Sequence, residues 1–461
     1  MARVLVYIAN QMFARNYLQK NAFADIMQKH DVVLLGPEEL EVPAQFEEIC
    51  VVKKVEIPQK DKAVSYQIFD LLMFANAHKS KTFAFRIERQ FFPWFPRHSS
   101  LSLQTLGKSF RHFLVRLKLL LMWSALKIQS LPPFLDFSLA RLSRAQRRES
   151  ELSRFVDEYA PEAILVPTSS CEHETMCLLG KAIKDDIKFM MVVDNWDNLS
   201  SKTVLQGMPT RMTVWGAQSK RHAIDIQGVD EDRVDIIGTA RFDTYFEKRG
   251  QSSPAPFNFP YILFVGTALA FNEGLALSHW NDVVERHKDK LGGLKVIYRP
   301  HPYRHSREIV DLAKLSNVML DPQMQESYQA EFKKTEPDLD YYPSLLGNAE
   351  FVTGGLTSML IEALIMNKHF VCQAYEDRNY HANMANVRRN YIHFDGLEDI
   401  DAFHYVNNEA ELEDVFLSVW QNRNEIDQAK HDAALDHFVH ITSTNYNARL
   451  AGVLDDMIQA G

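Results

Sequence analysis

The sequence predicts an α/β protein made of two doubly wound, Rossmann-like domains. Short apolar runs typical of buried strands alternate with helical patterns through residues 1–247, and the same alternation restarts at 261 and continues to 408. A Gly/Ser/Pro-rich stretch at 248–260 has the composition of a linker. We therefore expect two parallel sheets covered by helices, facing each other across a cleft, with the tail at 409–461 forming C-terminal helices.

Composition sets the outer limits of this interpretation. With 461 residues and 46% hydrophobic residues, the chain is long and apolar enough to bury two cores. Four cysteines are too few for a disulfide framework, and the N-terminus lacks the apolar region and cleavage site of a signal peptide, so we expect a cytoplasmic protein. The net charge of −9 argues against nucleic acid as a partner.

The first domain begins with strand-like Arg3–Ile8, a helix expected over 16–29 and strand-like Asp31–Leu35, which Gly36-Pro37 ends. Four later runs also read as strands: 163–167, 188–194, 212–215 and 234–238.

A basic helical insertion at about 97–150 interrupts the first domain. Between Arg97 and Arg148, eight cations stand against the single acid Asp136: Lys108, Arg111, Arg116, Lys118, Lys127, Arg141, Arg144 and Arg147. Its apolar residues fall on one helical face, either an ordinary core-facing stripe or a surface that lies on anionic lipid. In the second case Trp123 and the aromatic residues of 91–95 sit at the interface, and the protein is peripheral on the inner membrane. A span is excluded, because apolar Leu119–Leu126 is far shorter than the ~20 residues that a bilayer needs.

A dense polar loop, Asn195-Trp-Asp-Asn-Leu-Ser-Ser-Lys202, follows the strand that ends at Asp194. Polar residues at the carboxyl end of a strand often carry function, although Asn, Asp and Ser are also common in ordinary turns. Glu172 occupies another strand-to-helix turn.

The second domain opens with strand-like Tyr261–Gly266 and a Gly266-Thr267 turn. A later strand leads into Arg299-Pro-His-Pro302, which places Arg299 and His301 at a carboxyl end, where ligands bind in open α/β sheets. The prolines restrict the backbone on both sides of His301. A structural histidine is the alternative reading.

A third turn, Thr353-Gly-Gly-Leu-Thr-Ser358, leaves a strand and opens a helix. Gly354 and Gly355 allow close backbone approach, and the amides that start the helix favour a phosphate. Thr357 and Ser358 either cap the helix or bind the same phosphate. Glu362 is placed either to accept hydrogen bonds from a ribose diol or to lie in solvent.

Metal binding is not expected. His301 and His305 have the spacing of metal ligands, but Pro302 interrupts the helix geometry and no third ligand accompanies them. Asp338-Leu-Asp340 has the form found in metal-dependent sugar transferases, yet it follows a polar stretch and is interpreted as a loop.

In combination these motifs resemble bacterial surface-polysaccharide transferases of the GT-B type. The resemblance rests on Asn195–Lys202, Gly238-Thr-Ala-Arg-Phe-Asp243, Arg299–Pro302 and Gly354–Glu362, and it covers about 163–373. The chain looks most like the branch that includes teichoic-acid glycerophosphotransferases and Kdo transferases. Gly354-Gly355 stands where the glycerophosphotransferases have an aspartate-containing motif, which shifts the weight toward sugar transfer.

The resemblance implies a metal-independent glycosyltransferase that needs no cofactor. It implies a nucleotide-sugar donor, CMP- or CDP-linked as first choice and Kdo-like in the closest branch, and a surface polysaccharide or lipid-linked acceptor. The second domain would hold the donor through Arg299, His301, Gly354, Gly355, Thr357, Ser358, Glu362, Gly266 and Thr267.

In the first domain the hypothesis is that Asp197, or failing it Asp194, serves as base or nucleophile, with Glu172 as the next candidate. Asn195, Asn198 and Lys202 are candidates to contact the acceptor or the donor sugar. A polyol-phosphate transferase, a nucleotide-sugar epimerase and a non-catalytic scaffold in a polysaccharide complex are the alternatives.

Overall fold

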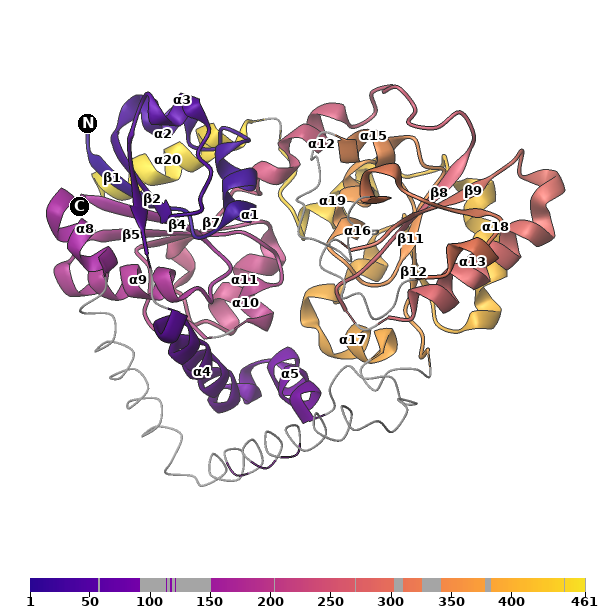
Figure 1. Cartoon of the computed structure of the whole chain (residues 1–461), viewed down its shortest axis with the longest axis horizontal. Coiled ribbons are helices and arrows are strands. Elements are labelled where there is room, and N and C mark those ends of the chain that lie inside the picture. The colour runs from indigo at the N-terminus through magenta and orange to yellow at the C-terminus, as the bar shows by residue number, and fades with distance from the viewer. Residues whose placement is uncertain are drawn as a thin grey trace. The chain divides into compact units, whose positions relative to one another are not determined.

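A computed structural model describes the chain at residues 1–56, 59–91, 113, 117, 121, 151–202, 204–269, 271–301, 310–325, 341–377, 383–442 and 444–460. The chain divides into two compact units. The first takes its described residues from Met1–Glu88, Arg111–Asp243 and Asp436–Gly461, and the second from Arg89–Phe110 and Thr244–Leu435. The tail is thus shared between the units, because α20 (Tyr446–Gln459) returns to the first, where it packs on α2 (Ala24–Lys29) (Figure 1).

The first unit is built on a parallel sheet of seven strands in the order β3-β2-β1-β4-β5-β6-β7. The strands are β1 (Arg3–Tyr7), β2 (Asp31–Pro37), β3 (Val51–Val55), β4 (Ala163–Thr168), β5 (Lys188–Val193), β6 (Arg211–Val214) and β7 (Val234–Ile236). Its helices include α1 (Gln11–Phe13), α3 (Ala44–Glu47), α4 (Gln59–Ala75), α5 (Lys81–Phe91), α8 (Glu151–Tyr159), α9 (His173–Asp185), α10 (Asn198–Ser201) and α11 (Ala217–Asp225).

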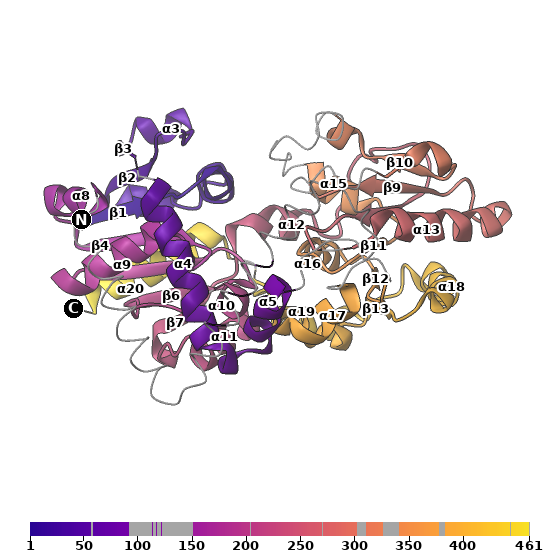
Figure 2. The same cartoon turned by 60° about the horizontal axis from the view of Figure 1, so that its bottom comes forward.

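Both faces of the first sheet are buried, as a parallel sheet requires. Val4 and Val6 of β1 point into one core, to which α2 and α20 contribute. Leu5 and Tyr7 alternate into the opposite core, which α8 and α9 complete. Figure 2 shows α4 running beside α9, and the two helices are in contact.

The second unit has a parallel sheet of six strands in the order β10-β9-β8-β11-β12-β13. The strands are β8 (Tyr261–Val265), β9 (Lys295–Arg299), β10 (Val318–Leu320), β11 (Val352–Gly354), β12 (Phe370–Gln373) and β13 (Phe403–Val406). The helices are α12 (Asp243–Lys248), which begins one residue before the unit, α13 (Glu273–His287), α15 (Tyr341–Gly347), α16 (Met359–Ile365), α17 (Met384–Asn390), α18 (Leu412–Asn422) and α19 (Gln428–Asp436). Trp280 of α13 packs on Phe416 of α18 with ring centroids 6.0 Å apart, which fixes both helices to the sheet.

Each sheet reverses its strand order once. In the first sheet the reversal falls between β1 and β4, and in the second between β8 and β11. Ligands of open α/β sheets bind beyond the carboxyl ends of the strands at such a switch point. The predicted fold class of two doubly wound parallel sheets is confirmed.

The chain departs from the expected elements at several places. The continuous helix expected over 16–29 is wrong: a π-helical turn, Ala14–Leu18, is followed by turns and then by α2. Asn21 explains the break, because its φ of +53° lies in the left-handed region. The edge strands β3 and β13 were not predicted. The sequence also predicts a helix near 306–315, and the described part of that stretch contains only the 3-10 turn Leu312–Lys314.

The basic insertion lies almost wholly outside the described residues, as do Trp123, His305 and Asp338-Leu-Asp340. Three residues of the insertion are described, Phe113, Leu117 and Leu121; they are helical and 58%, 43% and 63% exposed. In the described part of the chain, every helix falls short of the length and apolarity needed to cross a bilayer.

Candidate active site

The turn from β4 to α9 is closed by Glu172. Its carboxylate accepts hydrogen bonds from the Ser169 amide at 3.0 and 3.1 Å and from the Thr168 hydroxyl. The adjacent His173 is buried and bonded to Ser65 through Nδ1, with its Nε2 3.3 Å from a cysteine sulfur. Glu172 therefore orders the backbone at the switch point of the first sheet, and its catalytic role stays a prediction.

Asp194 follows β5 and is only 5% exposed. Asn16, which precedes Asp194 by 178 positions, donates a hydrogen bond to its Oδ1 at 3.1 Å. Burial raises the pKa of Asp194 to about 6, while the Asn16 hydrogen bond and the charges of Arg241 and Arg15 act to lower it. A carboxyl group with this pKa exchanges a proton near neutral pH, as a general acid or base must.

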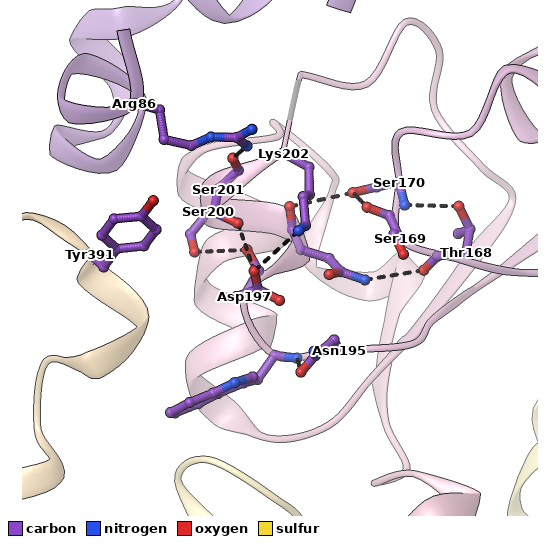
Figure 3. A network of polar contacts seen from close by, with 12 residues as sticks. Arg86, Thr168, Ser169, Ser170, Asn195, Asp197, Ser200, Ser201, Lys202 and Tyr391 are labelled. Carbon is purple, nitrogen blue, oxygen red and sulfur yellow. Dashed lines mark hydrogen bonds and ion pairs between the residues drawn. The ribbon is translucent and has the colours of Figure 1, made fainter. Parts of the chain in front are cut away.

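Asp197, three residues further on, lies in a different environment. Its side chain is 19% exposed, accepts a hydrogen bond from the Ser201 hydroxyl at 2.9 Å, and lies 3.6 Å from the Lys202 ammonium group (Figure 3). This carboxylate is held by α10 and reaches solvent. It has the access that a base or nucleophile needs, and the two candidate aspartates are thus distinguished by burial.

The two asparagines of this loop are structural in part. The Asn195 side chain accepts from the Trp196 amide at 3.0 Å. Asn198 is 1% exposed and donates to the Thr168 carbonyl at 3.3 Å. With its amide turned over, it would donate to Asp197 Oδ1 at 3.0 Å and accept from the Asn195 amide at 3.2 Å. In either orientation Asn198 ties the loop after β5 together, and contact of either asparagine with a sugar stays a prediction.

Arg86 of α5 also fixes this loop, by donating to the Ser201 carbonyl (Figure 3). The Ser80 hydroxyl donates to the neighbouring carbonyl of Ser200 at 3.3 Å. These contacts come from a segment more than a hundred residues away, so no local pattern indicates them.

In the second unit three turns meet at the switch point. Gly266, directly after β8, donates its amide to the Arg299 carbonyl at 2.7 Å. A Cβ atom on Gly266 would lie 2.6 Å from the His301 amide nitrogen, closer than any real contact allows. The next residue, Thr267, donates its hydroxyl to the Leu356 carbonyl at 2.8 Å. These contacts join the ends of β8, β9 and β11, so the predicted turns do come together.

Gly354 and Gly355 lie where a side chain would meet neighbouring atoms. Gly354 has a φ of +154°, and a Cβ there would lie 2.3 Å from the Val265 carbonyl oxygen. A Cβ on Gly355 would lie 3.1 Å from Met384 Sδ and from a ring carbon of Phe271. The glycines thus permit tight packing of backbone at this edge.

Thr357 and Ser358 begin α16 but do not cap it. Ser358 has helical φ and ψ and makes no capping hydrogen bond with its side chain. Within the described residues, neither hydroxyl has a hydrogen-bond partner in the protein. Thr357 is 8% exposed, and His301 and Ser358 are half-buried. Plain capping, the alternative reading for Ser358, is wrong.

Arg299 is engaged by protein side chains. It is 1% exposed, forms an ion pair with the fully buried Asp321, donates to the Tyr342 hydroxyl and stacks over the Tyr342 ring at 4.0 Å. Such a pair fixes the end of β9 to β10 and α15. The phosphate contact proposed for Arg299 stays a prediction, and the geometry favours a positioning role.

Glu362 is also engaged. It is 2% exposed and accepts a hydrogen bond from the Tyr245 hydroxyl at 2.6 Å. The reading of Glu362 as a solvated helix glutamate is therefore wrong, and its contact with a ribose stays a prediction.

Sequence reasoning missed Glu273, the first residue of α13, which is fully buried. Its carboxylate accepts from the Thr267 amide at 2.9 Å and from the Tyr298 hydroxyl at 2.5 Å, so it holds the turn after β8. A glutamate in the first turn of a helix six residues beyond Gly-Thr was the available signal.

No group of three or more metal-ligating side chains with suitable geometry is present among the described residues.

The fold of this chain is similar to that of several solved structures. No family model matches the sequence, and no curated protein sequence matches it. A putative UDP-N-acetylglucosamine 2-epimerase from Listeria monocytogenes aligns over 100% of this chain and 97% of its own, at 9% identity and a TM-score of 0.50. A co-structure of S. aureus MnaA with UDP aligns over the same shares at 9% identity and a TM-score of 0.51. A glycosyltransferase from Rickettsia africae ESF-5 aligns over 99% and 98% at 11% identity and a TM-score of 0.48. At identities this low, the first two matches show the fold alone: the chain has the two-domain GT-B fold.

Proposed function

We propose that this chain is a glycosyltransferase that uses a nucleotide-activated sugar and binds the nucleotide at the switch point of its second unit. The observation that carries the proposal is the meeting of three turns there. Gly266-Thr267, His301 and Gly354–Ser358 are joined by contacts through Arg299 and Leu356. Glycine-lined backbone, two hydroxyls and a half-buried imidazole form a surface suited to a phosphate that brings its own negative charge.

The donor nucleotide is proposed to be CMP or CDP, from the resemblance to Kdo transferases and glycerophosphotransferases. The S. aureus MnaA co-structure contains UDP, which makes uridine nucleotides the first competitor to test. The acceptor is proposed to be a surface polysaccharide or a lipid-linked glycan. Binding of the basic insertion to an anionic membrane would bring the enzyme to such an acceptor, and the exposure of Phe113, Leu117 and Leu121 supports that contact.

In the first unit, Asp197 is proposed as the base or nucleophile, with Lys202 as the neighbouring cation. Asp194 is the second choice. Its burial suits a group that holds a proton rather than one that attacks a sugar carbon.

A second candidate function is a nucleotide-sugar epimerase. It is favoured by the whole-chain likeness to the Listeria protein described as a putative UDP-N-acetylglucosamine 2-epimerase. An epimerase changes its nucleotide sugar without an acceptor, whereas a transferase leaves the sugar on an acceptor. Conversion of the nucleotide sugar to its epimer in the absence of an acceptor, observed by NMR, would favour the epimerase and contradict the transferase.

Nucleotide binding is tested first, through the thermal stability of the purified chain with CMP, CDP, UDP and GDP. A ligand at ~100 times its dissociation constant stabilises by roughly 2.7 kcal/mol, which shifts the melting temperature clearly. We expect one nucleotide to stabilise the chain, and His301→Ala to remove the shift. Ser418→Ala, on an exposed face of α18, is the matched control and should keep it. No shift with any of the four nucleotides would contradict the proposal and favour the scaffold.

A further inference from the structure

The switch point of the first unit contains a rare element that the proposed function does not use. Immediately beyond β1 and α1, the chain forms the π-helical turn Ala14–Leu18, in which the Gln19 amide bonds to the Ala14 carbonyl at 3.0 Å. π-Turns interrupt regular helix geometry and are frequent at functional sites. This one brings the side chains of Arg15 and Asn16 together: the guanidinium donates to Asn16 Oδ1 from two nitrogens, at 3.2 and 3.1 Å.

The turn connects Arg15 to the candidate carboxyl group. Asn16 is 2% exposed, and its side-chain NH2 group donates a hydrogen bond to Asp194 Oδ1 at 3.1 Å. Its amide is therefore held from both sides, and it fixes the guanidinium of Arg15 and the carboxyl group of Asp194 relative to each other.

A second guanidinium comes from another turn at the sheet's carboxyl edge. Arg241 lies in the 3-10 turn Ala240–Phe242, beyond β7, and this turn packs against the π-helical turn. The Thr239 hydroxyl accepts from the Arg241 amide at 3.4 Å, which orders the start of the turn. Like Arg15, Arg241 is half-buried, and the positive charges of both act on the Asp194 carboxyl group.

Charges of both signs act on Asp194 at this edge. The positive charges of Arg15 and Arg241 lower its pKa, and the negative charge of Glu172 raises it. Tyr17, on the same π-helical turn, is fully buried, and burial together with the neighbouring Asp194 raises the pKa of its hydroxyl well above the usual value, so that group stays neutral. Paired guanidinium groups with planar donors recognise oxyanions more strongly than they recognise neutral hydroxyls.

We propose that Arg15 and Arg241 form an anion subsite in the first unit that binds a carboxylate or phosphate carried by the sugar or by the acceptor. The proposal rests on the proposed function and deepens it: the substrate of the first unit is an acidic glycan component rather than a neutral sugar. Asn16 is the positioning residue that holds Arg15 against the edge of the sheet.

The test uses the full chain and small probes, without nucleotide. Glucuronate supplies the carboxylate and glycerol 3-phosphate the phosphate, and glucose and glycerol are their uncharged partners. Binding is measured by titration with ligand-observed NMR. We expect at least one charged probe to bind about tenfold more tightly than its uncharged partner, and the stronger of the two identifies the oxyanion. Equal binding of charged and uncharged probes would overturn the proposal.

Variants locate the subsite. Arg15→Gln and Arg241→Gln should each weaken the charged probe about tenfold. Arg221→Gln, which removes a cation from an exposed position on α11, should have no effect. Arg241→Lys keeps the charge and should retain part of the affinity, which separates a binding role from misfolding.

The result of this test can be distinguished from the result for the proposed nucleotide site. Charged-probe affinity that is unchanged in both Gln variants and lost in His301→Ala would place the anion in the second unit and overturn the subsite. Affinity that depends on Arg15 and Arg241 supports the subsite even where no nucleotide binds, in which case only the donor proposal fails.

Discussion

The carboxyl edges of the two sheets hold their candidate sites at equivalent switch points but use different chemistry. At the first edge Asp194 is buried with a pKa of about 6, and the charges of Arg15 and Arg241 act on it. The second edge is close-packed, with glycines, two hydroxyls and His301, and its carboxylates Glu273 and Glu362 are buried against tyrosine hydroxyls. A ligand that brings its own charge and needs close backbone approach suits the second edge. A group that gains and loses a proton is better placed at the first.

The ion pairs of the two edges differ in their exposure to solvent. Asp197 and Lys202 in the first unit are 3.6 Å apart and reach solvent, so either charge can meet a substrate. Arg299 and Asp321 in the second unit are almost completely buried. A charge that is removed from water in this way stabilises the fold. We therefore expect the buried pair to be structural and the exposed pair to contact substrate.

The largest effect is expected from Arg299→Met. Removing the guanidinium leaves Asp321 charged and buried, which should lower the free energy of unfolding by about 3 to 5 kcal/mol, measured by urea denaturation. Arg286→Met removes one partner of the exposed pair with Glu413 and should cost less than about 1 kcal/mol. A loss of nucleotide affinity in Arg299→Met with no change in the unfolding free energy would contradict the positioning role.

Gly354→Ala should lower the unfolding free energy by about 3 kcal/mol, because the added Cβ meets the Val265 carbonyl and the φ of +154° is strained. Gly274→Ala in α13 is the control in the same unit. Its Cβ would find only ordinary contacts, at 3.6 Å or more, and alanine favours the helix, so the unfolding free energy should be unchanged or slightly raised. Equal effects of the two substitutions would contradict the tight packing of backbone at the second edge.

Asp194→Asn should make the chain more stable at high pH. Burial raises the pKa of Asp194 from 3.8 to about 6, so the folded state binds its proton more tightly than the unfolded state does. The stability that comes from this proton is complete below pH 3.8 and is lost as pH rises through 6. At pH 8 the variant should therefore exceed the parent chain by about 2 kcal/mol, a difference that shrinks toward zero near pH 4.

Denaturation curves at several pH values measure this difference. A constant difference across the range would show that the carboxyl group is not destabilised by burial, and the contrast between the two edges would fail.

The smallest effects on stability are expected from Thr357→Val and Ser358→Ala. Neither hydroxyl bonds to the protein within the described residues, so the melting temperature should hardly change. Nucleotide affinity should fall about tenfold, or about 1.4 kcal/mol, for each substitution, measured by isothermal titration calorimetry. Unchanged affinity in both variants would mean that these hydroxyls do not contact the phosphate.

Much of the fold could be predicted because apolar periodicity is local. The central strands are continuous apolar runs, such as Tyr261–Val265. The two switch points were not predicted, because they depend on the order of the strands within each sheet. The edge strand β3 was missed because Val51–Val55 contains two lysines and is partly exposed, which is how edge strands are kept from pairing. The break in the helix expected over 16–29 depends on the left-handed conformation of Asn21, a residue that helices also accept.

The candidate sites could be predicted only in part. The turns themselves were found, because glycines and polar residues after strands are visible in the sequence. Their partners were not, since Asn16 meets Asp194 across 178 positions and Tyr245 meets Glu362 across 117. Whether Arg299 faces a ligand or an ion pair was equally hidden, because it depends on Asp321 from the next strand.

Binding of the nucleotide to the second unit is tested most directly by amide hydrogen exchange, measured by mass spectrometry with and without the nucleotide that stabilises the chain most among CMP, CDP, UDP and GDP. We expect slower exchange in peptides that contain Gly266-Thr267 and Gly354–Ser358, with no slowing of this kind in His301→Ala. Slower exchange confined to the first unit, or none at these turns, would contradict the assignment of the nucleotide to the second unit.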